Sequence, residues 1–172
     1  LVPLVKKIIL GTAIVEGAGA VLYATQFIPE FGVGYGIWAA VFNSISAFCN
    51  AGMDIVKEDS FRSYVTNPVI NFTTMALIVL GGLGFIVWKD LWQSMKKLIK
   101  EKIPVKRIVQ QLKFQTKIVL AISTFLILFG TVLIFLFEYH NPATMGNLSL
   151  PGKVMASLFQ AVTTRTAGFE TV

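Results

Sequence analysis

Two stretches of this sequence, far apart in the chain, repeat one pattern. Residues 42–54 read FNSISAFCNAGMD and residues 159–170 read FQAVTTRTAGFE. With one residue of gap, both give Phe, an amide, a small residue, a β-branched apolar residue and a hydroxyl. Both then end on Ala-Gly, a bulky apolar residue and an acid. Repetition of this kind indicates that the chain contains two copies of one structural unit.

Long apolar stretches surround the two copies. The 172-residue chain is 55% hydrophobic and 14% charged, with a mean hydropathy of +0.71, whereas soluble domains carry about 25% charged residues. The stretches 8–28, 69–88 and 118–137 hold 21, 20 and 20 residues, and Glu16 is their one charged residue. About 20 apolar residues in a helix cross a hydrocarbon core of about 30 Å. We therefore expect an all-α membrane protein with three spanning helices.

Two further apolar stretches, 33–48 and 154–162, are too short to cross a membrane. The first begins among glycines, and each is followed by polar residues and an Ala-Gly pair. Short segments of this type are more often re-entrant than spanning. A short helix followed by extended backbone at membrane depth is tolerated only where protein buries it or where it lines a water-filled path. The repeat therefore predicts a pore loop, and the fold becomes a series of helix–pore-loop–helix units.

Basic residues give the expected orientation. The stretch 89–117 holds nine of the 15 basic residues, and two more, Lys6 and Lys7, precede the first span. The positive-inside rule places these eleven residues in the cytoplasm and the four others outside. The expected organisation is a helix–pore-loop–helix repeat over 1–88 with its filter loop at 49–54, then a basic cytoplasmic loop over 89–117. Residues 118–172 supply the first helix, pore helix and filter loop of the next repeat.

The loops suggest a selectivity filter made of backbone carbonyl oxygens. Such filters aim successive carbonyls at a dehydrated ion, and glycine reaches the φ values that this geometry needs without a Cβ penalty. The candidate ion-filter residues are Asn50, Ala51, Gly52, Thr166, Ala167 and Gly168. Asp54 and Glu170 follow the glycines and are candidates for concentrating cations at the pore mouth.

Three other residues or motifs have simpler explanations than a ligand site. We interpret Arg165 as a brace for its loop, because a positive charge lining the path would repel a cation. The run Gly81-Gly82-Leu83-Gly84 indicates close helix packing, since no strand precedes it as a dinucleotide site requires. One cysteine, Cys49, leaves no internal disulfide framework.

Other function classes find less support in the sequence. We expect no enzyme, because no nucleophile arrangement, P-loop or metal-ligand cluster is visible. The basic loop lacks the interleaved aromatic residues of nucleic-acid binding, so we expect no nucleic-acid partner. Two alternatives to a pore remain: a secondary transporter with broken helices, and a non-transporting scaffold that recruits a partner through its basic loop. Candidate contacts with such a partner or with lipid head groups are Lys96, Lys97 and Lys100.

The two loop segments, together with Gly81-Gly82-Leu83-Gly84-Phe85, resemble the Trk/Ktr/HKT superfamily of potassium transporters over nearly the whole chain. The resemblance implies four helix–pore-loop–helix repeats around one potassium-channel-like pore, each with a key glycine. By position, Gly52 and Gly168 are two of these four glycines. The chain then holds the second repeat and the first half of the third. Two filter strands cannot encircle an ion, so we expect the chain to be part of a longer pore.

The resemblance also implies cofactors, partners and a location. The transported ion is K+, Na+ is a candidate activator, and no organic cofactor or further metal is expected. Partners are the lipid bilayer, a second copy in a homodimer, and a cytosolic nucleotide-binding regulatory subunit of the KtrA/TrkA type. The location is the cytoplasmic (inner) membrane of a bacterium. The expected function is potassium uptake by a channel-like transporter subunit.

Overall fold

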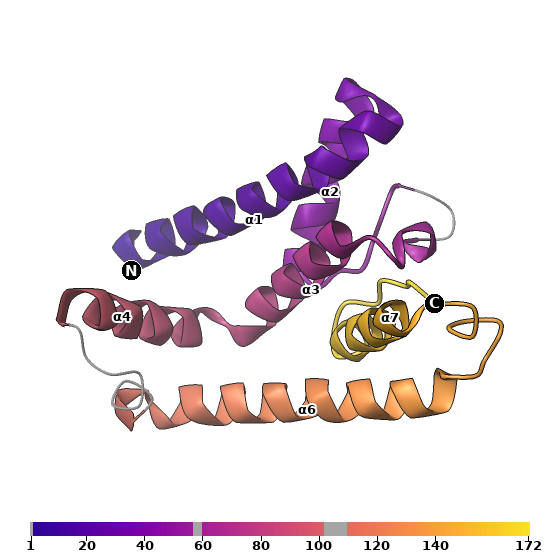
Figure 1. Ribbon diagram of the computed structural model, residues 1–172. Coiled ribbons are helices and arrows are strands. Elements are labelled where there is room, and N and C mark those ends of the chain that lie inside the picture. Colours follow the sequence, from indigo (N-terminus) through magenta and orange to yellow (C-terminus); the bar gives the residue numbers. More distant parts are fainter. Residues whose placement is uncertain (1, 57–59, 102–109) are drawn as a thin grey trace. The chain divides into compact units, whose positions relative to one another are not determined.

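The structure is a computed structural model that describes residues 2–56, 60–101 and 110–172 (Figure 1). The described residues form helices and loops without a strand, which confirms the all-α fold. In chain order the elements are α1 (Val2–Phe31), α2 (Val33–Phe48), the short 3-10 helix η1 (Arg62–Tyr64), α3 (Pro68–Leu83), α4 (Phe85–Glu101), α6 (Phe114–Glu138) and α7 (Leu150–Thr163).

The long helices fit the predicted membrane spans. By length and composition, Val5–Phe31 of α1 and Phe114–Glu138 of α6 are long and apolar enough to cross a bilayer. The bent pair α3 and α4 gives a third span if it is counted as one. Large apolar side chains are exposed along α1 and α6, among them Ile14, Leu128 and Val132. Exposed apolar surface on this scale fits lipid rather than water as the solvent.

Two glycines with positive φ separate consecutive helices. Gly32 has φ 81° and separates α1 from α2, so the predicted short segment 33–48 is a helix with the expected bounds. Gly84 has φ 78° and separates α3 from α4. The prediction of one unbroken helix over 69–88 was therefore wrong, because the chain takes a left-handed turn at Gly84 that only glycine adopts easily.

The chain divides into two compact units. The larger contains Leu1–Gly82 and Ile127–Val172, and the smaller contains Leu83–Leu126. Inside the larger unit, small residues let α1 and α2 approach closely. A Cβ at Gly36 would lie 2.7 Å from Ile28 Cα, and Ser44 Oγ donates to the Glu16 carbonyl oxygen at 2.6 Å. Small residues at such contacts are typical of helix packing in membranes.

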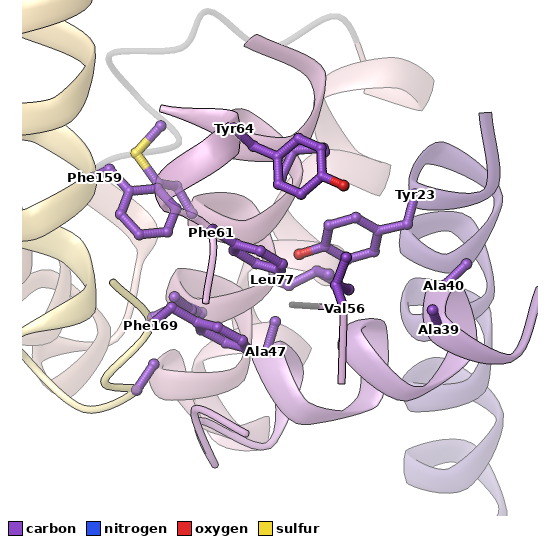
Figure 2. Close-up of a cluster of buried hydrophobic side chains, with 14 of the residues drawn as sticks. Tyr23, Ala39, Ala40, Ala47, Val56, Phe61, Tyr64, Leu77, Phe159 and Phe169 are labelled. Atoms are coloured by element: carbon purple, nitrogen blue, oxygen red, sulfur yellow. The ribbon is translucent and has the colours of Figure 1, made fainter. Parts of the chain in front are cut away.

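Aromatic side chains fill the core of the larger unit. Figure 2 shows Tyr23, Phe61 and Tyr64 near the middle of the core, with Phe169 below Phe61 in this view. The Tyr23 ring stacks on Phe27 with centroids 5.4 Å apart. The buried Tyr23 and Thr74 hydroxyls share a 2.6 Å hydrogen bond, so the phenol is not left unpaired in the core.

The smaller unit is organised around one carboxylate. Asp90 on α4 is buried, and its Oδ2 accepts a 2.9 Å hydrogen bond from the backbone N–H of Lys113, just before α6 begins. Val87, Leu112 and Thr116 of the same unit are also buried. Because the first N–H groups of a helix region lack backbone partners, Asp90 fixes the point where the chain enters α6.

Candidate ion-filter loops

The first loop, residues 49–54, begins with hydrogen bonds to the last turn of α2. Cys49 N–H donates to Ile45 O at 2.8 Å, and Ala51 N–H donates to Ser46 O at 2.9 Å. Asn50 has φ 55° and Gly52 has φ 67°. Two left-handed residues within three positions turn the chain out of the helix, as is common at helix C-termini.

The second loop, residues 164–170, closes α7 in a similar way. Ala167 N–H and Gly168 N–H both donate to Thr163 O, at 2.9 and 3.2 Å. Gly168 N–H also lies 3.1 Å from Thr163 Oγ1, and Gly168 has φ 92°. The main acceptors of the two loops, Ser46 and Thr163, hold the same place in the sequence repeat, so the repeat extends to the hydrogen bonds.

The structure brings the two loops into direct contact. Thr166 Oγ1 donates to Asn50 Oδ1 at 2.9 Å. A Cβ built on Gly52 would lie 1.9 Å from the Ala167 carbonyl oxygen, so that oxygen occupies the space left by the missing side chain. A Cβ on Gly168 would meet no atom within 4 Å. Four of the six candidate filter residues therefore meet at one place.

The glycine pair near the end of α3 packs behind the first loop. A Cβ on Gly81 would lie 1.8 Å from Phe48 O, and one on Gly82 would lie 3.6 Å from a terminal nitrogen of Arg165. These contacts support the predicted role of the pair in close packing. They also place the Arg165 guanidinium over Gly82, where a larger side chain would compete with it for space.

A short segment that the sequence did not single out holds the end of the second loop. Phe61 N–H donates to Glu170 O at 2.9 Å. The Phe61 and Phe169 rings stack in parallel with centroids 5.1 Å apart, and both are buried. We call Phe61, Arg62, Phe169 and Glu170 the clamp, since they join the connection after the first loop to the end of the second.

The clamp changes the expectation for the pore mouth. Arg62 lies 2.9 Å from a carboxylate oxygen of Glu170, and both side chains are more than half exposed. This ion pair offsets the Glu170 charge that was expected to attract cations. Asp54, by contrast, has no charged partner within the part of the chain that the structure describes.

Next to the clamp, Tyr64 ties η1 to the end of α1. Its hydroxyl donates to Glu30 Oε2 at 2.5 Å. Burial, the hydrogen bond and the negative charge of Glu30 all raise the pKa of the Tyr64 phenol. The phenol therefore stays protonated and remains a donor. Tyr64 also packs edge-on against Phe61 of the clamp, with ring centroids 6.2 Å apart.

Sequence reasoning missed the clamp because its partners come from distant segments. A local signal existed: the run Phe61-Arg62-Ser63-Tyr64 is rich in aromatic residues for a connection between helices. An aromatic-rich segment of this kind is expected to pack against other parts of the protein, but the pattern does not identify those parts.

The remaining predicted residues, Lys96, Lys97 and Lys100, belong to the smaller unit. Lys96 and Lys97 are exposed on α4, while the side chain of Lys100 falls outside the described residues. In the described ranges no group of three His, Cys, Asp or Glu side chains is arranged to hold a metal ion.

The whole chain matches a known protein family. The model of the TrkH family, described as cation transport protein, matches residues 1–172. The chain belongs to the TrkH family. Among curated TrkH-like relatives, it is 41% identical over 169 residues to the Ktr system potassium uptake protein B of Vibrio alginolyticus and 34% identical over 169 residues to that of Bacillus subtilis.

The matches cover most of this TrkH-family chain but only part of each relative. The two B proteins align with 98% of the chain and 35% of their own lengths. The potassium/sodium uptake protein NtpJ of Enterococcus hirae is 33% identical over 92% of the chain and 32% of its own length. The chain thus spans about a third of the length of these curated relatives.

Proposed function

We propose that this chain forms part of a potassium uptake pathway across the cytoplasmic membrane of a bacterium. In this proposal Asn50, Ala51 and Gly52 supply carbonyl ligands from one repeat. Thr166, Ala167 and Gly168 supply them from the next. The pathway is a channel or a channel-like transporter. Family membership and the names of the relatives, which are potassium uptake proteins, support this assignment.

One observation carries the proposal most directly: the two repeated loops meet. The Thr166–Asn50 hydrogen bond and the close approach of Ala167 O to Gly52 join loops that follow two different pore helices. A filter requires strands from separate repeats to converge on one axis, so that their carbonyls surround the ion. Two unrelated helix-ending turns would have no reason to pair in this way.

Potassium is the proposed main cargo, and Na+ is a secondary candidate as activator or competing ion. The two B proteins are potassium uptake proteins by name, whereas NtpJ is a potassium/sodium uptake protein. We infer no organic cofactor and no enzymatic step. Transport needs only the carbonyl ligands and a water-filled path.

The proposed assembly follows from family membership. We propose a homodimeric membrane unit whose N-terminal end and basic stretch 89–117 face the cytoplasm. A cytosolic nucleotide-binding regulatory subunit of the KtrA/TrkA type would dock on that side. The excess of lysine and arginine in that stretch supports the orientation, and the Ktr system names of the relatives support the partner.

Growth of a potassium-uptake-deficient bacterium at low potassium tests the function. The full-length protein that contains this chain is compared with its Gly168→Ser variant, with the regulatory subunit supplied. We expect the parent to restore growth. The variant should lose growth or potassium selectivity, because serine strains the positive φ at this position. Gly34→Ser in α2 is the matched control, since Gly34 has open space and no positive φ.

The possible outcomes distinguish the claim of potassium transport from the assignment of the filter residues. Failure of a correctly expressed parent would overturn potassium uptake. Equal rescue by the parent and by Gly168→Ser, with the same K+/Na+ preference, would keep transport but remove the second loop from the filter. Loss of growth in Gly34→Ser would show that any serine in these segments is harmful, and the filter assignment would then have no support from this assay.

A further inference from the structure

Helix α4 differs from the other helices because it is both basic and amphipathic. Between Phe85 and Lys97 it carries three lysines, two tryptophans and one acid, Asp90. Asp90 is buried and bonded to the Lys113 N–H just before α6, and Val87 on the same helix is also buried. The one acid of this stretch is thus buried and bonded, and the charged side chains that residues 85–97 expose are lysines.

The exposed part of α4 divides into two neighbouring stripes. Trp88, Trp92 and Met95 follow a spacing of four and three residues, which places them along one line of the helix. Trp92 is 62% exposed and Met95 is 54% exposed, so this line is apolar and open to the surroundings. Trp88, at its start, is half-buried.

The second stripe consists of lysines. Lys89 and Lys96 are seven residues apart and therefore lie on one line of the helix, and both are exposed. The Lys96 ammonium group lies 5.4 Å from the centroid of the Trp92 ring, so the two stripes touch. An aromatic line bordered by a lysine line is typical of helices that lie in the membrane interface.

We propose that the part of α4 after Trp88 lies at the cytoplasmic surface of the membrane and binds anionic phospholipids. Trp92 and Met95 enter the boundary between head groups and acyl chains. Lys89 and Lys96 contact the phosphates of phosphatidylglycerol-type lipids. The proposal rests on the cytoplasmic orientation given under the proposed function, because anionic lipids attract basic segments at that face.

Lipid fits this surface better than a protein partner does. Protein interfaces are depleted in lysine, while exposed tryptophan and lysine side chains together suit the head-group region. Lysine is a flexible point charge that follows mobile phosphates without a fixed geometry. The exposed side chains of α4 therefore match a fluid anionic surface. A cytosolic subunit covering α4 is the competing outcome of the test below.

The test uses the full-length protein with a single cysteine at position 95 (Met95→Cys, other cysteines replaced), labelled with an environment-sensitive fluorophore. It is reconstituted into phosphatidylcholine vesicles containing either brominated phosphatidylcholine or brominated phosphatidylglycerol at equal mole fraction. We expect stronger quenching by brominated phosphatidylglycerol. In K89Q/K96Q this preference should fall by up to about 25-fold, about fivefold for each lysine lost near an anionic surface.

Two variants make the result specific. K6Q/K7Q removes the same charge from exposed lysines of α1 and should keep the preference at position 95. K89R/K96R keeps the charge and should also keep it. Equal quenching by both lipids in the parent protein, or an unchanged preference in K89Q/K96Q, would overturn lipid binding by α4. So would a label that brominated lipid does not reach but that added regulatory subunit shields.

Failure of this inference is distinct from failure of the proposed function. Potassium uptake is measured in the same vesicles. A parent protein that transports potassium without lipid preference at position 95 overturns only the inference. A parent protein that shows the preference without transporting potassium leaves lipid binding in place and overturns the transport proposal.

Discussion

Gly52 and Gly168 hold equivalent places in the two loops, yet their surroundings differ. Both have positive φ, 67° and 92°. Only Gly52 has another atom in the space of a side chain, the Ala167 carbonyl oxygen at 1.9 Å from the ideal Cβ. Alanine at either position pays a conformational cost of about 1–2 kcal/mol for the left-handed backbone. At position 52 it must also push the second loop away.

We therefore predict that Gly52→Ala and Gly168→Ala have unequal effects on transport. Gly168→Ala should lower the K+/Na+ uptake ratio by about tenfold, corresponding to the strain of about 1–2 kcal/mol. Gly52→Ala should abolish the discrimination, because the added methyl group also separates the loops. Uptake of both ions by vesicles containing the full-length variants measures the ratio. Equal losses would mean that the approach of Ala167 to Gly52 has no role in selectivity.

At the scale of elements, glycine explains one success and one failure of sequence reasoning. The bounds of α2 were predictable because Gly32 stands where an apolar stretch is already interrupted. The break at Gly84 was not, since Gly81, Gly82 and Gly84 lie inside an uncharged run that reads as one span. Helix packing against Phe48 explains Gly81, and only the φ of Gly84 reveals the break.

Asp90 is the residue that joins α4 to the start of α6, and its loss should loosen this corner. We predict that Asp90→Ala removes the bond to the Lys113 N–H and destabilises the corner by about 2 kcal/mol, as for buried hydrogen bonds to charged groups. Hydrogen exchange of the Lys113 amide should become about 30-fold faster. Asp90→Asn keeps an acceptor, so its Lys113 amide should exchange at a rate between those of the parent and of Asp90→Ala.

Gln93→Ala is the matched control for the corner, because Gln93 lies on the exposed side of the same helix. It should leave exchange at Lys113 unchanged. If Asp90→Ala also left it unchanged, Asp90 would not determine where the chain enters α6.

At the scale of the larger unit, the clamp depends on an aromatic stack and an ion pair of unequal strength. Phe61 and Phe169 are almost completely buried, whereas Arg62 and Glu170 are 56% and 59% exposed. Exposed ion pairs contribute about 0–1 kcal/mol. Truncating a buried phenylalanine costs about 3–5 kcal/mol. The Phe61–Phe169 stack should therefore stabilise the position of the second loop. The Arg62–Glu170 ion pair should mainly lower the negative charge next to that loop.

We predict that Phe61→Ala lowers the free energy of unfolding by about 3–5 kcal/mol, while Arg62→Gln lowers it by less than about 1 kcal/mol. Unfolding of the purified full-length protein in mixed micelles measures both. Arg62→Gln should instead raise cation uptake at low ionic strength, because Glu170 is left unneutralised. A large loss of stability in Arg62→Gln would contradict this division of roles.

The contacts at this scale are those that the sequence could not supply. The repeat predicted that residues 49–54 and 164–170 would be alike, and the loops do end their helices with similar hydrogen bonds. It did not predict that Thr166 would bond to Asn50 or that Phe61 would stack on Phe169. Pattern similarity says that two segments share a conformation, whereas their contact depends on the packing of every helix between them.

The approach of Ala167 to Gly52 has a consequence for how an internally duplicated protein changes over time. After duplication, two copies are ordinarily free to accumulate substitutions separately. Here the backbone of one copy occupies the volume of a methyl group absent from the other. A replacement of Gly52 is therefore tolerated only after a compensating change in the second copy. Substitutions in the two copies are therefore coupled. A change at Gly52 survives only when the compensating change in the second copy comes first.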